Sequence, residues 1–335
     1  MTMTMLSDGP GTVPGDLLHA LHGAERVLVA AHARPDGDAV GSCTAMAWIL
    51  RALGKDVILY NENEFPEWLG FLSKPCPVVT DPSMLPFRPD LIVALDCGDA
   101  ERLGAGIVPL LAKTPVVNID HHRGNSGFGS AANWVRPDAA AAGQLVAEIA
   151  EALGTGLEAS AAEAIYVAIS CDTGNFSFGN TDASVLALAA KLASGGLEVA
   201  RLREKMDNTW SEGKWRLRAR LMSDMRLLEG GRLAAAVVPL GTVEECGAKK
   251  EDMEGFVEEM RRLRGTRVAL LLREENECGS VKTKISLRSS GNDDVRSVAA
   301  AFGGGGHLNA AGASYAGRAE EALAALLPEL RAIWA

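Results

Sequence analysis

The sequence predicts an α/β protein, in which a mostly parallel sheet flanked by helices is followed by a smaller α/β domain. Short apolar runs rich in Val and Ile alternate with longer Ala- and Leu-rich runs of helical spacing, as in βαβ units. Aromatic residues make up only 5% of the chain, so aliphatic side chains must form the core. The alternation stops near Gly195 and resumes after Gly231, and 335 residues are enough for two domains.

The first predicted domain covers residues 16–199. Its strand candidates are compact and apolar, as expected for strands that are buried on both faces. These strands are predicted at residues 27–31, 56–60, 91–95 and 116–119. The Ala- and Leu-rich runs predict helices at residues 39–53, 101–111, 139–153, 161–170 and 184–194.

Residues 200–230 are rich in Arg and have helical spacing, which predicts a helical linker. The second predicted domain covers residues 231–335. Strands are predicted there at residues 233–238, 268–272 and 283–287, and helices at residues 251–264 and 320–334.

The net charge of −10 argues against a protein that coats nucleic acid. An acidic protein can still bind phosphates if cations neutralise the carboxylates of its site.

No apolar run reaches the roughly 18–20 residues of a membrane span, so we expect no membrane partner. Six cysteines without a C-x-x-C pair, and no signal-like basic N-terminus, predict reduced thiols and a cytoplasmic protein.

The strand predicted at residues 27–31 runs directly into His32, Asp36 and Asp38. Ligands of open α/β sheets gather at the carboxyl ends of strands, so these side chains are candidate metal ligands. The structural alternative is that Asp38 only caps the following helix. That alternative does not account for His32 and Asp36.

Three further segments end in the same types of side chain. Asp96 follows the strand at 91–95, and Asp172 follows an apolar stretch and precedes a Gly turn. The strand at 116–119 is followed by Asp120, His121 and His122. Carboxylate and imidazole ligands suit Mn²⁺ or Mg²⁺ better than a Cys-rich zinc site would.

A run of glycines, residues 303–306, precedes His307 and is the main feature of the second domain. We expect the run to enter a helix, where backbone N–H groups bind an anion and His307 contacts a phosphate. Upstream, Lys282, Lys284 and Arg288 alternate along a strand and therefore share one face. A flexible linker is the alternative for the glycines. The motif of ATP-hydrolysing P-loops does not occur in the sequence.

Taken in order, these motifs resemble the DHH phosphoesterase superfamily, and within it the nanoRNase and pAp-phosphatase type. The resemblance extends from about Leu17 to Ala335. It rests on the set H-x-x-x-D-x-D (32–38), Asp96, Asp-His-His (120–122), Asp-Thr-Gly (172–174) and G-G-G-G-H-x-x-A-A-G (303–312).

The resemblance implies a catalytic lobe and a smaller DHH-associated substrate lobe, with the active site in the cleft between them. It implies two divalent metal ions, most commonly Mn²⁺, with Mg²⁺ as the alternative. The ligands of one metal would be His32, Asp36 and Asp96. The ligands of the other would be Asp38, Asp96, His121 and Asp172, so that Asp96 bridges the two.

The resemblance also implies that His122 faces the substrate phosphate and that Asp120 orients a ligand. A terminal phosphate or nucleotide would be held by Arg288, Gly304, Gly305, Gly306 and His307. Leu308 departs from the family, which often has a basic residue there, and Arg123 could replace the lost phosphate contact.

The function implied is hydrolysis of short single-stranded RNA or DNA oligonucleotides and of 3′-phosphoadenosine 5′-phosphate (pAp). Hydrolysis of cyclic di-AMP or pApA stays open, as does a homodimer. The acidic charge disfavours a long-strand exonuclease of the RecJ type, and the glycine run disfavours a family II inorganic pyrophosphatase. From another class, a non-catalytic nucleotide-binding module stays open, although every expected ligand position is filled.

Overall fold

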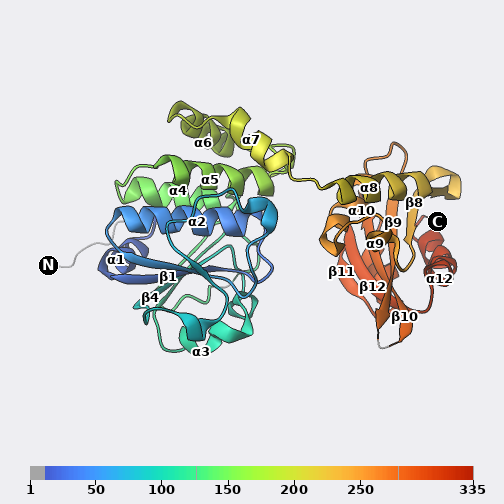
Figure 1. Cartoon of the computed structure of the whole chain (residues 1–335), viewed down its shortest axis with the longest axis horizontal. Coiled ribbons are helices and arrows are strands. Elements are labelled where there is room, and N and C mark those ends of the chain that lie inside the picture. Colours follow the sequence, from blue (N-terminus) through green and yellow to red (C-terminus); the bar gives the residue numbers. More distant parts are fainter. Residues whose placement is uncertain (1–11, 126, 278, 335) are drawn as a thin grey trace. The chain divides into compact units, whose positions relative to one another are not determined.

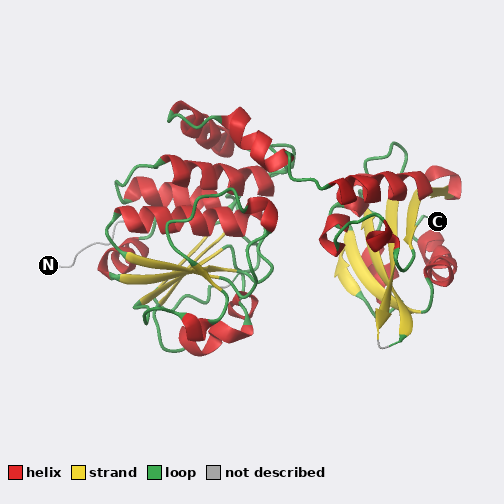
Figure 2. Ribbon diagram, in the orientation of Figure 1, coloured by secondary structure: helices red, strands yellow, loops and turns green. Residues whose placement is uncertain are grey.

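The computed structural model describes residues 12–125, 127–277 and 279–334. The chain divides between Asn208 and Thr209 into two compact units, here called unit 1 and unit 2. Each unit is built on its own six-stranded sheet, drawn in yellow in Figure 2. The predicted α/β fold, with a parallel sheet in the first domain and a second sheet after it, is confirmed.

The sheet of unit 1 is parallel throughout and has the strand order β3-β2-β1-β4-β5-β6. The strands predicted from the sequence are all present, and β3 and β6 are additional short strands. Their bounds are Arg26–Ala31 (β1), Asp56–Tyr60 (β2), Val78–Val79 (β3), Leu91–Leu95 (β4), Val116–Asp120 (β5) and Ala132–Val135 (β6). The order reverses between β1 and β4, which is where ligands bind in folds of this kind.

Helices α2, α4 and α5 cover one face of this sheet, and α3 lies on the other (Figure 1). The helices of unit 1 are α1 (Gly15–Gly23), α2 (Gly37–Ala52), α3 (Val108–Leu111), α4 (Ala142–Ala152), α5 (Ala159–Asp172), α6 (Ala183–Ser194) and α7 (Val199–Asp207). The helix predicted at 101–111 is wrong, because two 3₁₀ turns precede the four-residue α3. Gly104 separates the two turns with a φ of 103°, which no helix tolerates.

Glycine lets α2 and α5 approach closely. A Cβ atom added at Gly41 of α2 would lie 2.5 Å from the carbonyl oxygen of Ala164 in α5. A Cβ at Gly143 of α4 would lie 2.4 Å from the Cβ of Ala168. This close packing brings the first turn of α2, the start of α4 and the end of α5 to one edge of the sheet.

The sheet of unit 2 is mixed and has the order β11-β12-β10-β9-β8-β7, with β8 and β9 parallel and the other pairs antiparallel. Helices α8 and α10 pack on one face, and α11 and α12 pack on the other. The strands are Arg226–Leu228 (β7), Leu233–Val238 (β8), Val268–Glu277 (β9), Ser280–Ser289 (β10), Gly305–His307 (β11) and Ala310–Ala316 (β12). The helices are Glu212–Asp224 (α8), Thr242–Glu245 (α9), Phe256–Met260 (α10), Val295–Ala300 (α11) and Ala319–Ala332 (α12).

The glycine run ends a helix and enters a strand, so the expectation that it begins a helix is wrong. Gly303 has a φ of 70° and follows α11, and its N–H donates to the carbonyl oxygen of Ala300. Gly305 and Gly306 then form β11 with His307. A Cβ at Gly304 would lie 2.1 Å from the carbonyl oxygen of Gly312. The glycines therefore allow the tight pairing of β11 with β12.

The helix predicted at 251–264 is interrupted. A 3₁₀ turn (Lys250–Met253) is separated from α10 by Gly255, whose φ is 78°.

The five cysteines that the structure describes are free thiols. Within the described ranges, no single helix could cross a membrane, although the bent pair α6 and α7 meets the length and composition criteria together.

Candidate metal centre

Six carboxylate and imidazole side chains meet at the carboxyl edge of the unit 1 sheet. They come from the loop after β1, the ends of β4 and β5, the first turn of α2 and the last residue of α5. These residues are His32, Asp36, Asp38, Asp96, His121 and Asp172. All six are the metal ligands predicted from the sequence.

Asp38 is fully buried at the start of α2. Its carboxylate accepts hydrogen bonds from the backbone N–H groups of Ala142 (2.6 Å) and Gly143 (3.0 Å), at the first turn of α4. Burial raises the pKa of Asp38 well above its usual value, and the nearby Asp96 and Asp172 raise it further. A buried carboxylate beside two others requires positive charge in its neighbourhood.

Asp96 lies at the centre of the group and is 2% exposed. Its Oδ2 is 3.5 Å from Nε2 of His32, and its Oδ1 is 3.4 Å from Nε2 of His121. Burial would raise the pKa of Asp96, but the two imidazoles hold the pKa below its ordinary value. The buried Oδ1 has no hydrogen-bond partner among the described residues. The backbone φ of Asp96 is 52°, so the residue that directly follows β4 has a strained conformation of the kind that clusters at functional sites.

His121 points into a space lined by three carboxylates. Its Nε2 lies 3.5 Å from Asp38, 3.4 Å from Asp96 and 3.2 Å from Asp172. Burial would lower the pKa of His121, but these carboxylates raise it to about 9. Burial raises the pKa of Asp172 to about 6.

Three hydrogen bonds orient the ligands on the other side of Asp96. Nδ1 of His32 lies 2.9 Å from the carbonyl oxygen of Ala33, so Nε2 faces Asp96 and Asp36. Burial would lower the pKa of His32, but the nearby carboxylates of Asp36 and Asp96 raise it to about 10. Asp36, rather than Asp38, caps α2: its Oδ1 accepts from the N–H groups of Asp38 and Ala39, each at 3.1 Å.

The six residues and His122 form three overlapping groups whose possible ligand atoms lie within 4.8 Å of one another. The groups are His32 with Asp36 and Asp96, Asp38 with His121 and Asp172, and Asp96 with His121 and His122. The donors are oxygen and imidazole nitrogen, as divalent Mn²⁺ and Mg²⁺ prefer. The buried Oδ1 of Asp96, which lacks a hydrogen-bond donor, fits a cation as its partner.

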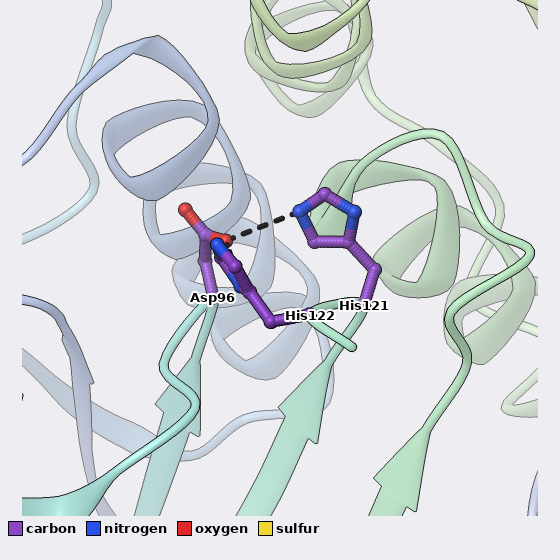
Figure 3. A group of neighbouring side chains, drawn as sticks. All are labelled: Asp96, His121 and His122. Atoms are coloured by element: carbon purple, nitrogen blue, oxygen red, sulfur yellow. Dashed lines mark ion pairs between the residues drawn. The ribbon is translucent and has the colours of Figure 1, made fainter. Parts of the chain in front are cut away.

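His122 is half exposed beside this group, and Figure 3 shows it with His121 at the end of β5, next to Asp96. Its Nδ1 lies 2.8 Å from Oδ1 of Asp120, which is fully buried. This hydrogen bond raises the pKa of His122. The other oxygen of Asp120 accepts from the side-chain amide of Asn125 at 2.7 Å.

Asn125 and Asn118 also belong to this site and were not among the residues predicted from the sequence. The amide of Asn125 also donates to Oδ1 of Asn118 (2.9 Å), and that of Asn118 donates to the carbonyl oxygen of Cys97 (3.0 Å). This chain of hydrogen bonds fixes Asp120, which in turn fixes the ring of His122. A single Asn, in a strand like Asn118 or after one like Asn125, gives no signal in one sequence, because its role depends on the fold.

The predicted phosphate-binding residues lie in both units. Arg123 is exposed directly after the histidines of unit 1. In unit 2, Arg288 pairs with Ala310, which in turn pairs with His307, so these side chains share one face of the sheet. That face is the one covered elsewhere by α10, whose Glu258 accepts a hydrogen bond from Arg288 at 2.7 Å.

Comparison with known proteins gives matches over both units. A family model described as "DHH family, N-terminal domain" matches residues 26–169, and one described as "DHHA1 domain" matches residues 230–334. The solved structure of an exopolyphosphatase-related protein from Bacteroides fragilis is 26% identical, with a TM-score of 0.84, and the alignment covers 95% of this chain and 96% of that one.

Two curated proteins named "Bifunctional oligoribonuclease and PAP phosphatase NrnA" are similar over most of their length. The one from Thermus thermophilus is 35% identical over 302 residues, which are 90% of this chain and 87% of that protein. The one from Bacillus subtilis is 26% identical over 302 residues, 89% and 92% of the two chains.

Proposed function

This chain belongs to the DHH family of phosphoesterases, and from that premise we propose that it hydrolyses short single-stranded oligonucleotides and pAp. The main support for the proposal is the position of Asp96, which is buried and belongs to two of the three groups of candidate ligands. The similar proteins whose names state these two activities support the choice of substrates.

Enzymes of this family depend on metal ions, and we assign two divalent cations, Mn²⁺ in preference to Mg²⁺, to this site. One would be held by His32, Asp36 and Asp96. The other would be held by Asp38, His121 and Asp172, with Asp96 shared. The carboxylates of Asp38, Asp96 and Asp172 are mostly buried close to one another and therefore repel. The imidazoles offset this repulsion only in part, and two divalent cations would offset the rest.

Divalent cations, when bound, polarise phosphoryl oxygens and lower the pKa of a water molecule. The residues of the chain position the substrate and move protons. We propose that His122 donates a hydrogen bond from Nε2 to a phosphoryl oxygen or to the leaving oxygen. Asp120 supports this role, since its hydrogen bond to Nδ1 fixes the ring and favours the charged imidazole.

We assign the binding of a terminal phosphate or nucleotide to unit 2, through Arg288, His307 and the backbone of Gly304, Gly305 and Gly306. The cross-strand register supports the pairing of Arg288 with His307 on one face. Arg123 would add a cation to the phosphates at the unit 1 site. We also propose a cytoplasmic location, which the free thiols support.

The proposal is tested by incubating the purified chain and Mn²⁺ with a 5′-labelled trinucleotide, pAp, cyclic di-AMP and pyrophosphate. We expect turnover of the trinucleotide and of pAp, and none by an Asp96→Asn variant. Preferential turnover of cyclic di-AMP would replace the proposed substrates with dinucleotides. Absence of turnover on all four, with metal shown to be bound, would leave a nucleotide-binding module.

A further inference from the structure

Trp68 is a partly exposed aromatic residue in a chain that has few aromatics. It lies in a 3₁₀ turn (Glu67–Leu69) that follows β2, and 37% of its surface is exposed. A single exposed apolar side chain is common at a protein surface, so the place of Trp68 in the fold decides what it can do. Its position in unit 1 indicates what it would bind.

The ring of Trp68 rests against the backbone of the candidate metal centre. A Cβ atom added at Gly37 would lie 3.4 Å from Cη2 of Trp68 and 2.2 Å from Sγ of Cys171. Gly37 separates the carboxylates of Asp36 and Asp38, and Cys171 precedes Asp172. The indole therefore lies close to the start of α2, where Gly37 separates two candidate ligands, and the Asp36 side chain there is 60% exposed.

The turn that carries Trp68 is firmly anchored. Leu69 is fully buried, and its N–H donates to the carbonyl oxygen of Pro66 at 2.9 Å. Leu72, at the end of the same segment, is 2% exposed and packs in the core of unit 1. The indole is thus held on a fixed support, which reduces the entropy that a ligand must overcome on binding.

A second exposed aromatic residue, Phe178, lies against the turn that follows α5. A Cβ atom at Gly174, two residues after Asp172, would lie 2.3 Å from Cζ of Phe178, so that ring covers the glycine. Phe178 is 56% exposed. Two exposed rings thus lie against glycines that are one and two residues away in the sequence from candidate metal ligands.

We propose that Trp68 stacks on a nucleobase of the substrate whose phosphate lies at the carboxylate and imidazole group. This inference rests on the proposed function, and it adds a base-binding residue to a site that otherwise contacts phosphate. Every base has a π face, so stacking is tolerant of sequence. Such a contact suits an enzyme that degrades oligonucleotides of any sequence.

The alternative is that Trp68 only covers Cys171 and the first turn of α2. The two roles differ in what can replace the ring. A stacking role requires a flat aromatic side chain, so Phe would restore it and Leu would not. A covering role requires apolar volume, so Leu would serve as well as Phe.

The test is calorimetric titration of the Mn²⁺-loaded protein with adenosine 5′-monophosphate and with ribose 5-phosphate, which lacks the base. We expect Trp68→Ala and Trp68→Leu to weaken the binding of adenosine 5′-monophosphate by roughly 5- to 150-fold. The binding of ribose 5-phosphate should not change, and Trp68→Phe should retain most of the affinity. Trp215, 63% exposed in unit 2, gives the control Trp215→Ala, which should bind both ligands normally.

Equal losses for both ligands, or restoration by Leu, would overturn stacking. So would unchanged affinity in Trp68→Ala. These results would leave the proposed function intact if the unmodified chain turns over the trinucleotide and pAp. Failure of the unmodified chain to bind adenosine 5′-monophosphate would overturn the stacking role, whereas the turnover of the trinucleotide and pAp tests the proposed function separately.

Discussion

Nε2 of His121, at the end of β5, lies 3.2 Å from Oδ2 of Asp172, the last residue of α5. The two residues belong to different layers of unit 1, a strand of the sheet and a helix packed on it. Their contact depends on how closely α2, α4 and α5 pack. We therefore expect distinct effects from substitutions of the ligands, of the residues that orient the ligands and of the residues where these helices touch.

Replacing Asp96 by Asn should abolish turnover while the protein stays folded. The amide keeps the shape of the side chain but removes the charge shared by the two proposed metals, so we expect kcat to fall by at least about 10²-fold. Manganese content, measured by elemental analysis, should fall as well. Without metal, the variant should be less stable than the unmodified chain, because the imidazoles of His32 and His121 lose their charged partner. Normal kcat in this variant would refute the metal assignment.

Removing metal should destabilise unit 1 and leave unit 2 unchanged. At 100 times its dissociation constant, a ligand that binds only the folded state stabilises it by about 2.7 kcal/mol. For a unit of this size we expect the unfolding temperature of unit 1 to rise by roughly 5–10 °C when Mn²⁺ is added to chelated protein. Scanning calorimetry with and without chelator measures the shift. An equal shift in Asp96→Asn would show that Mn²⁺ acts elsewhere.

Replacing Arg288 by Ala should raise KM and leave kcat nearly unchanged, since the guanidinium is proposed to bind a phosphate that does not react. Its partner Glu258 is 42% exposed and can be solvated when the Arg is lost, so folding should not suffer. Initial rates over a range of pAp concentrations separate the two constants. Arg296, an exposed residue that pairs with Asp294, supplies the control Arg296→Ala. A fall in kcat alone would assign Arg288 to the chemical step.

Replacing Asn125 by Ala should lower kcat without loss of metal. The amide holds Asp120, and through it the ring of His122, so the variant should misplace the imidazole. Loss of such a supporting residue costs about 10- to 100-fold. Rates at saturating substrate, together with the manganese content, test this role. A parallel loss of manganese would show instead that Asn125 supports the metal site.

The sequence was sufficient to predict the long strands of unit 1 and all six side chains that meet at their ends. Buried parallel strands are continuous apolar runs, and a charged residue directly after such a run lies at the carboxyl edge of the sheet, where ligands bind. Interrupted helices were harder to predict, since a glycine such as Gly104 or Gly255 has a positive φ only in its tertiary context. The glycine run was misassigned for the same reason. The small size of glycine allows β11 to pair with β12, and no local sequence pattern predicts that pairing.

Adding one methyl group at Gly41 should weaken both the fold and the site. The new Cβ would lie 2.5 Å from the carbonyl oxygen of Ala164, so α2 must move away from α5. Overpacking of this kind costs about 1–3 kcal/mol. Because α2 carries Asp38 and α5 carries Asp172, Gly41→Ala should also weaken Mn²⁺ binding. The control is Gly23→Ala in α1, where a Cβ meets no atom within 4 Å. Denaturant unfolding and metal titration of both variants would measure the two effects, and normal Mn²⁺ affinity in a destabilised Gly41→Ala would show that the site does not depend on this packing.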